Sequence, residues 1–391
     1  MNQPQIGVNE CQRRMCVSRK NVAWNTGKIP TEYTYITMSA KIIALYLPQY
    51  HPTPENDKWW GPGFTDWRSV NTAKSLFRGH VQPKVPADLG YYDLRLEETR
   101  IQQGNLAMEY GIDAFCYWHY WFGNGERLLD YPFNEVLKSG KPSISFCLGW
   151  ANHSWYKKTW HVEGNNILLK EQKYLGIKDY ELHFNTMLPA FMDERYFRLN
   201  GKLVFIVYDP LGTEEMKQFI STWRRMAREH SLGDFFFIGH DTYCRNKKKI
   251  IDCGFDAIYN DNMFGILHYE SFFRKMAHAI MQRIFHRPMV FEYKDAIQYM
   301  LSDEEKNEDV CPTIVPNWDH SPRSGTKNPI FVNSKPRYFE RLVKQACKLV
   351  SGKKNNLIIL KSWNEWGEGN YLEPDMEFGR GMLEALRNGK E

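Results

Sequence analysis

The stretch NLIILKSWNEW, residues 356–366, joins an unbroken apolar run to a polar and aromatic ending. Its first half does not alternate between apolar and polar residues, which is typical of a strand buried on both faces. Its second half begins a cluster in which Glu365 and Glu368 are interleaved with Trp363 and Trp366. The stretch therefore predicts a buried strand that ends in a group of acids and tryptophans.

Seven further apolar runs precede this one, and helical patterns lie between several of them, at 97–110, 213–230 and 335–350. Alternation of strands and helices argues for parallel βαβ units. Eight such units predict a (β/α)8 TIM barrel, a fold of the α/β class. A doubly wound sheet is the alternative, but no G-x-G-x-x-G motif follows the first run. The eight runs are 41–50, 111–121, 143–152, 202–210, 234–241, 255–261, 313–319 and 356–366.

The intervals between the runs differ in length. Those at 51–110, 153–201 and 262–312 are long, which predicts insertions in the βα loops of a single domain. Residues 1–37 show no clear period before the first strand begins. We expect them to be a poorly ordered N-terminal extension, with residues 38–391 forming the catalytic barrel domain.

Composition restricts the class of protein. The chain has 391 residues, 42% hydrophobic and 25% charged, as in globular proteins. A net charge of +5 falls short of a nucleic-acid-binding signature, so no nucleic-acid partner is expected. Eight cysteines without a C-x-x-C pair favour a reducing compartment. With no secretory signal and no run of the ~18 apolar residues that cross a bilayer, we expect a cytoplasmic protein, at most peripheral to the inner membrane.

Each apolar run becomes polar or aromatic at its end. In a barrel all eight ends face one rim, where enzymes of this fold place their sites. Asn and Asp can instead simply end strands and cap helices, but that alternative does not account for the accumulated His and Trp. The predicted substrate-binding residues at or beside these ends are Tyr50, His51, His119, Trp121, Trp150, Asn152, His153, Tyr208, Asn317, Asp319 and Asn364.

The pair Glu365 and Glu368 is the candidate catalytic site. Cleavage of an acetal needs one carboxyl to protonate the leaving oxygen and a second to activate a nucleophile or stabilise charge. Gly367 and Gly369 permit a sharp turn that brings both acids to one space. Aromatic walls can raise the pKa of one acid, as a general acid requires. A loop whose acids cap a helix or pair with Arg and Lys is the alternative, and spacing alone leaves both open.

Two aromatic stretches predict a carbohydrate-binding cleft. FCYWHYWFGNGERLLD (115–130) surrounds His119 with rings, which favours a platform on which sugars stack; a histidine satisfied within the core or rim is the alternative. Residues 47–67 carry Trp59 and Trp60 in a proline-rich loop, which is either a lid with an outer sugar subsite or a packed structural loop. Tyr120, Trp366 and Glu373 complete the predicted substrate-binding set.

Residues 268–288, HYESFFRKMAHAIMQRIFHRP, predict a basic amphipathic helix. Such a helix can lie on an anionic membrane. More often its apolar face covers the barrel or a partner, and we favour that interpretation.

Several motifs are absent from the sequence. It has no D-x-D, P-loop, H-E-x-x-H or G-x-S-x-G motif. A metal-dependent nucleotide-sugar transferase of the usual kind therefore loses support, and we expect no cofactor.

Five segments together resemble the WbsX-type family, which is associated with bacterial lipopolysaccharide O-antigen and capsule biosynthesis and labelled as glycosyltransferases. They occur in the family's order, and the resemblance covers about residues 41–388. The segments are LYLPQYHPTPENDKWWGPGFTDW, GHVQPKVPADLGYYDL, GIDAFCYWHYWF, FCLGWAN and WNEWGEGNYLEPD.

The family in turn resembles glycoside hydrolase family 99, the endo-α-mannosidases, which are (β/α)8 barrels with an N-E-W-x-E-G motif after the last strand. The resemblance implies retaining cleavage without a covalent intermediate and without a metal. Glu365 would be the base for the sugar's own 2-hydroxyl, and Glu368 the acid for the leaving oxygen. The usual A-N-E-N-W after strand three is A-N-H-S-W here, so His153 replaces a carboxylate.

These observations predict a carbohydrate-active enzyme of surface-polysaccharide metabolism that acts on an oligosaccharide or lipid-linked glycan. Retaining endo-type glycoside hydrolysis or transglycosylation is the most concrete expectation. A glycosyltransferase of lipopolysaccharide biosynthesis and a non-catalytic glycan-binding protein are the alternatives.

Overall fold

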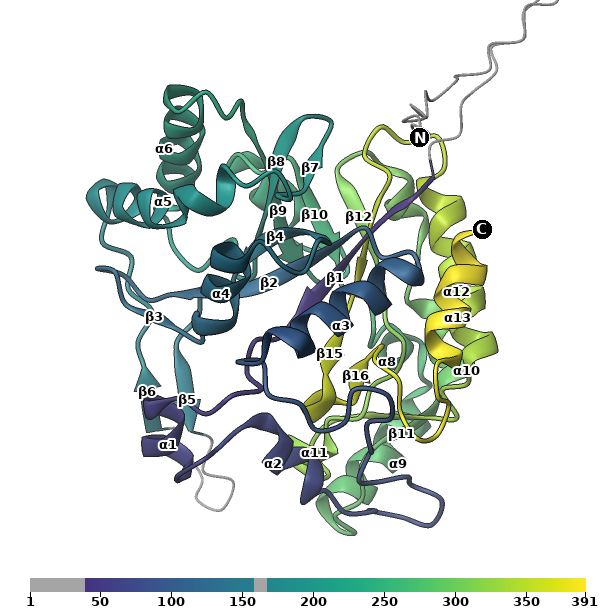
Figure 1. Ribbon diagram of the computed structural model, residues 1–391. Coiled ribbons are helices and arrows are strands. Elements are labelled where there is room, and N and C mark those ends of the chain that lie inside the picture. The colour runs from purple at the N-terminus through teal and green to yellow at the C-terminus, as the bar shows by residue number, and fades with distance from the viewer. Residues whose placement is uncertain (1–38, 158–166) are drawn as a thin grey trace, which may run out of the picture. The chain divides into compact units, whose positions relative to one another are not determined.

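The computed structural model describes residues 39–157 and 167–391, so the predicted N-terminal extension, 1–37, lies outside the described residues. Eight parallel strands form a closed barrel, in which β1 pairs with both β14 and β2 (Figure 1). The predicted (β/α)8 fold is confirmed. The barrel strands are β1 (Lys41–Tyr46), β2 (Ala114–Trp121), β4 (Ser145–Trp150), β8 (Lys202–Val207), β9 (Phe235–Asp241), β10 (Ala257–Asn260), β12 (Val310–Ile314) and β14 (Leu357–Leu360).

The strands follow the apolar runs closely, with one correction. The seventh run was placed at 313–319, whereas β12 begins at Val310 and ends at Ile314. Pro312 lies within this strand although a proline cannot donate to a ladder, and the sequence pattern therefore missed the first half. In the barrel strands almost every residue is buried, because side chains pack both into the barrel and against the surrounding helices.

Helices surround the strands, with α12 and α13 on one side of the barrel and α5 and α6 on another (Figure 1). The three predicted helices are confirmed as α3, α6 and α12, and α12 buries Phe339, Leu342 and Val343 at helical spacing. The main outer helices are α3 (Glu97–Glu109), α4 (Tyr131–Ser139), α5 (Ile177–Phe191), α6 (Met216–Glu229), α7 (Lys247–Asp252), α12 (Pro336–Val350) and α13 (Gly381–Lys390).

Additional elements lie in the long intervals, as predicted, and also in shorter connections outside them. The group α1, α2, α11, β15 and β16 lies at the end of the barrel to which β1 points (Figure 1). These elements are α1 (Pro54–Trp60), α2 (Asp66–Asn71), β3 (Arg127–Leu128), β5 (Trp155–Lys157), β6 (Ile167–Lys170), β7 (Arg198–Leu199), α8 (Ile266–Tyr269), α9 (Phe272–Arg283), β11 (Val290–Glu292), α10 (Tyr293–Ala296), α11 (Ser321–Ser324), β13 (Ile330–Val332), β15 (Asn364–Glu365) and β16 (Asn370–Tyr371). Three short 3₁₀ turns cover Ile297–Tyr299, Asp303–Lys306 and Trp366–Glu368.

The helix predicted within 268–288 forms as α9, but its expected packing is only partly right. None of its residues is buried, so its apolar face does not cover the barrel. The favoured interpretation is therefore wrong for the barrel and stays open for a partner. Within the described residues, no helix is both long enough and apolar enough to cross a bilayer.

Asn364 acts as a clamp between the segments that follow the first and last barrel strands, β1 and β14. Its side-chain oxygen accepts from the backbone N–H of Leu47 at 2.7 Å, and its amide donates to the carbonyl of Leu47 at 3.0 Å. The Tyr50 hydroxyl donates to the Asn364 carbonyl at 2.6 Å and accepts from the Trp366 N–H at 3.1 Å. Because Asn364 is fully buried, these bonds fix the loop after β14 to the loop after β1.

We expect Asn364→Ala to lower the free energy of unfolding by about 2–4 kcal/mol, because it leaves the buried N–H and C=O of Leu47 without partners. Chemical denaturation monitored by circular dichroism measures this. Asn307→Ala, at an exposed position, is the matched control. Equal stability of the two variants would contradict the clamp.

Candidate active site

A cavity of about 570 Å³ opens at the carboxyl ends of the barrel strands. Residues at or just after the ends of β1, β2, β4, β8, β10, β12 and β14 contribute to its wall. This is the rim at which barrel enzymes place their sites. The strand-end and loop residues that line it include Leu45, Trp118, Tyr120, Ala151, His153, Tyr208, Tyr259, Trp318, Lys361, Glu365 and Glu368.

Arg323, on the short helix α11, bridges the two predicted catalytic acids. One terminal nitrogen donates to Glu365 at 3.0 Å and the other donates to Glu368 at 3.0 Å. The same guanidinium donates to both oxygens of Asp66, at 2.7 and 3.2 Å. One cation therefore holds three carboxylates that come from two loops, Asp66 from the loop after β1 and the two glutamates from the loop after β14.

The acid loop, which follows β14 and carries Glu365 and Glu368, needs its glycines because other residues approach its backbone closely. A Cβ on Gly367 would clash with the carboxylate of Asp66 and with Nε of Arg323. Gly369 has a φ of +56° and abuts the backbone of Asp319, so a side chain there is both strained and obstructed. The tight turn predicted from the two glycines is present as the 3₁₀ turn Trp366–Glu368.

Burial raises the pKa of Glu365 to about 8, against an opposing effect of the Arg323 cation. The neighbouring carboxylates of Glu368 and Asp66 raise it further. The Glu365 side chain is 13% exposed, so little water stabilises its charge. A pKa near 8 favours the protonated form of Glu365 at neutral pH, which is the form in which a carboxyl can act as a general acid.

A second cation lies at the cavity wall. Lys361, next to the acid loop, donates to Asp261 at 2.7 Å. Burial alone would lower the pKa of Lys361, but Asp261 and Glu368 raise it above its usual value, so the ammonium stays charged. A histidine is also close to the second acid: His320 Nε2 lies 3.7 Å from the carboxylate of Glu368.

Aromatic side chains form the remaining walls. Trp60 and Tyr208 are 37% and 38% exposed, so each presents a partly free face to the cavity. His153 contacts the Tyr208 ring with centroids 5.1 Å apart, and Tyr208 stacks on His240. Flat rings with a polar edge suit the apolar faces and hydroxyls of sugars.

The structure brings together only part of the predicted substrate-binding set. Trp60, Tyr120, His153 and Tyr208 line the cavity, and Trp59 packs beside it against Trp155. Asn317 and Asp319 line a separate cavity of about 320 Å³. The buried remainder, outside the cavity lining, is Tyr50, His51, His119, Trp121, Trp150, Asn152, Asn364, Trp366 and Glu373.

Glu373 and Trp366 bind each other rather than facing the cavity. The carboxylate of Glu373 accepts from Trp366 Nε1 at 2.6 Å, from the Tyr92 hydroxyl at 2.8 Å and from Gln103 at 2.6 Å. Burial raises its pKa to about 7 despite these donors. The group ties the acid loop to α3, which is a positioning contact.

His119 lies behind the cavity wall, against His183 of α5, with their Nε2 atoms 2.7 Å apart. The ring of Trp121 stacks on His183. Burial lowers the pKa of His119 to about 3, with a smaller effect of Arg127, and burial also lowers the pKa of His183. Both imidazoles are therefore neutral and structural near pH 7.

Sequence reasoning missed Arg323, Asp66 and Lys361. Arg323 follows the seventh run within HSPRSG, and the rule that barrel rims are built from the βα loops was a signal for it. Asp66 lies in the aromatic loop 47–67, where the tryptophans drew attention instead. Contacts between residues 257 positions apart in sequence leave no local pattern.

Residues 42–386 match the family described as "Glycosyltransferase WbsX". The chain belongs to this family. A curated relative, the "Uncharacterized protein WxcX" of Xanthomonas campestris pv. campestris (strain B100), is 32% identical over 376 residues. That match covers 94% of this chain and 51% of WxcX, so the chain spans about half the length of the relative. The resemblance to the WbsX-type family is confirmed.

Solved structures show that this WbsX family member shares its fold with glycoside hydrolases. A "Glycoside hydrolase-like protein" superposes with a TM-score of 0.56 at 15% identity, over 93% of this chain and 97% of the other. The GH99 endo-alpha-mannosidase from Bacteroides thetaiotaomicron has a TM-score of 0.51 at 15% identity, over 89% and 95%.

The buried histidine pair makes a testable contribution to pH dependence. Below the ordinary histidine pKa of about 6.5 the unfolded chain binds protons at His119 and His183 that the folded protein does not. The contribution of this pair to the free energy of unfolding should therefore fall as the pH drops from 7 to 5, by up to about 1.4 kcal/mol per pH unit for each group, against the opposite contribution of the buried Glu365 and Glu373. Denaturant unfolding at pH 5, 6 and 7 measures this slope.

We expect His183→Gln to be less stable at pH 7 and to have a shallower slope. His286→Gln, at an exposed position, should retain the wild-type slope. An unchanged slope in His183→Gln would contradict a neutral buried pair.

Proposed function

We propose that this chain is a carbohydrate-active enzyme of bacterial surface-polysaccharide metabolism, which cleaves or transfers glycosidic bonds with retention of configuration. The observation that carries the proposal is the placement of Glu365 and Glu368 on one guanidinium, in a cavity with aromatic walls. The WbsX family and the shared glycoside hydrolase fold support it. An oligosaccharide or a lipid-linked glycan is the proposed substrate.

In the proposed first step one carboxylic acid gives its proton to the glycosidic oxygen as the C1–O bond breaks. The other carboxylate takes the proton of the sugar's 2-hydroxyl, whose oxygen bonds to C1 and leaves a 1,2-anhydro sugar. In the second step water, or an acceptor hydroxyl, bonds to C1 as the bond between C1 and the 2-oxygen breaks, and gives its proton to the first carboxylate. The protonated second carboxyl returns its proton to the 2-oxygen, so both groups regain their starting states.

The two lines of support assign the proton differently. Resemblance to glycoside hydrolase family 99 makes Glu365 the base and Glu368 the acid, whereas the raised pKa of Glu365 places the proton on Glu365 in the free protein. The proposed chemistry needs one protonated and one ionised carboxyl at each step. Leaving-group dependence distinguishes the assignments, because an aryl glycoside with a good leaving group bypasses the need for the acid in the first step.

Glycosyl transfer from a nucleotide sugar is the second candidate. The family description names glycosyltransferases, and the cations Arg323 and Lys361 at the cavity can contact phosphate oxygens. A glycan-binding protein without catalysis is a third candidate, since the aromatic walls alone suffice for binding.

The decisive experiment incubates wild type, Glu365→Gln and Glu368→Gln with free and lipid-linked oligosaccharide, with and without nucleotide sugars, and follows products by mass spectrometry. We expect nucleotide-independent cleavage that falls about 10²–10⁴-fold in each variant. Glu384→Gln, at an exposed position on α13, is the control and should retain activity. Chain extension that needs a nucleotide sugar would favour the transferase, and binding without turnover the third candidate.

The raised pKa of Glu365 also has a consequence that does not depend on activity. Between pH 5 and 8 the unfolded chain has lost the Glu365 proton and the folded protein has kept it, so this residue makes wild type less stable as the pH rises. Glu365→Gln should therefore gain stability relative to wild type over that interval, by up to about 1.4 kcal/mol per pH unit. Urea denaturation at pH 5, 6.5 and 8 tests this.

The Arg323 cation opposes this rise in the pKa of Glu365. In an Arg323→Met protein the stability gained from Glu365→Gln should therefore continue to grow above pH 8, which it should not do in the protein that keeps Arg323. A constant difference between wild type and Glu365→Gln across pH 5–8 would show that Glu365 is ionised in the free protein.

A further inference from the structure

Helix α9 has an unusual orientation, with its apolar side turned away from the protein. Phe272 and Phe273 are 74% and 76% exposed, and Met276 and Ile280 are 46% and 43% exposed. Ile284 and Phe285 continue the same surface, at 66% and 60%. Contiguous exposed apolar side chains of this kind usually mark an interaction site.

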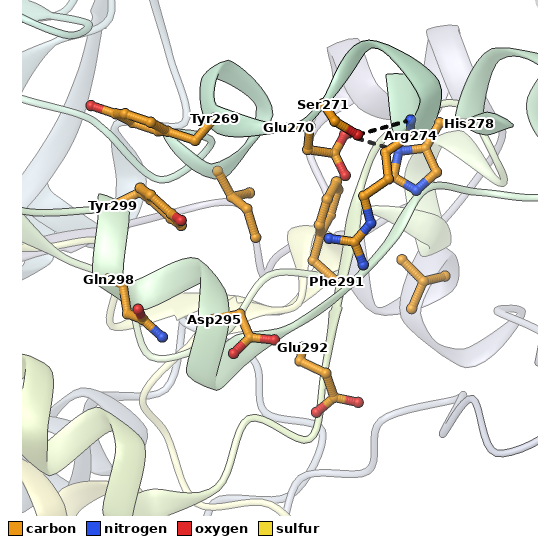
Figure 2. Close-up of a pocket in the computed structure, with 12 residues that line it drawn as sticks. Tyr269, Glu270, Ser271, Arg274, His278, Phe291, Glu292, Asp295, Gln298 and Tyr299 are labelled. Carbon is orange, nitrogen blue, oxygen red and sulfur yellow. Dashed lines mark hydrogen bonds and ion pairs between the residues drawn. The ribbon is translucent and has the colours of Figure 1, made fainter. Parts of the chain in front are cut away.

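The polar side of α9 faces inward instead. His278 lies 3.1 Å from the buried carboxylate of Glu270, and Gln282 donates to the carbonyls of Thr326 and Lys327 at 3.3 and 3.1 Å. Beneath the helix lies a cavity of about 520 Å³ into which the side chain of Arg274 extends, with Glu292 and Asp295 across from it (Figure 2). These polar contacts hold α9 in this orientation, so the outward direction of its apolar side is fixed by hydrogen bonds.

The exposed charges that residues 268–288 carry beside this apolar surface all have one sign. Lys275, Arg283 and Arg287 are exposed, while the Arg274 side chain extends into the cavity beneath the helix. The sole acid within residues 268–288 is Glu270, whose side chain is 3% exposed and lies against His278. The outward surface therefore combines aromatic and aliphatic side chains with basic ones, as helices that lie in a membrane interface do.

We propose that α9, together with Ile284 and Phe285, binds an anionic lipid bilayer surface, with Phe272 and Phe273 inserted at the headgroup boundary. The basic side chains match the negative charge of such a surface. A second copy of the chain fits less well, because a two-fold contact through this surface would bring the same three cations of both copies together. This inference goes beyond the proposed function and does not depend on catalysis.

The position of α9 connects this surface with the candidate active site. The same β10–β12 connection supplies Met263 and Phe264 to the cavity wall. Gln282 of α9 bonds to the loop just after α11, the helix that carries Arg323. Both helices lie at the end of the barrel to which β1 points (Figure 1). Binding through α9 would hold that end at the lipid surface, where a lipid-linked glycan is found.

Sedimentation with two kinds of vesicle tests the proposal on the full chain. One kind contains equal parts phosphatidylglycerol and phosphatidylcholine, and the other contains phosphatidylcholine alone. We expect wild type to bind the anionic vesicles. The double variant Phe272→Ser/Phe273→Ser and the variant Arg283→Glu should each bind these vesicles at least about tenfold more weakly. Arg283→Lys should retain binding, because the charge remains.

Matched controls are Met192→Ser, which removes an equally exposed apolar side chain elsewhere, and Lys248→Glu, an exposed charge reversal on α7. Both should bind as wild type does. Failure of wild type to bind anionic vesicles, or equal binding by the Phe272→Ser/Phe273→Ser variant, would overturn the proposal. So would a concentration-dependent dimer that this variant abolishes without any vesicle binding, since the occupant would then be a second copy.

Discussion

Closure of the barrel is the constraint on which the rest of the structure depends. Strand β1 can pair with both β14 and β2 because eight tilted strands complete a cylinder. That closure places the loop after the first strand beside the loop after the last, and Asn364 then fixes the two together. Glu365 is the next residue in the chain, so the position of the first candidate acid follows from a contact made to satisfy backbone hydrogen bonds.

The acid cluster shows how burial and charge are balanced. Three carboxylates held close together would repel one another, and a single guanidinium that donates two hydrogen bonds to Asp66 and one each to Glu365 and Glu368 offsets part of that repulsion. Relief is incomplete, which is why the pKa of Glu365 stays raised. The residues involved come from the loops after the first, seventh and eighth strands, and only the barrel brings those loops to one place. The chemistry proposed for the site is in this sense a property of the fold.

Much of the fold and part of the site could be predicted from local patterns. The eight strands were recognisable because doubly buried strands are unbroken apolar runs, and the acid pair because it lies within one short loop. His119, Trp121 and Trp150 were placed at the cavity because they end strands, yet successive side chains alternate across a strand and these point toward α5. Arg323 and Asp66 needed the closed barrel before their contact could be seen. For α9 the helix was predictable, but the direction of its apolar side depended on tertiary contacts of His278 and Gln282.

Because Arg323 lies among the acids at the cavity wall with its side chain only 24% exposed, the candidate site carries its own counterion. Buried charge pairs are poorly screened by dissolved salt, whereas attraction between exposed cations and a charged surface weakens as the Debye length falls to about 8 Å at physiological ionic strength. The candidate site and the proposed lipid-binding surface should therefore respond differently to salt: the acid cluster should change little, while the proposed lipid contact through α9 should weaken. A change of ionic strength should thereby alter the proposed binding to a lipid surface without altering the electrostatics of the cavity.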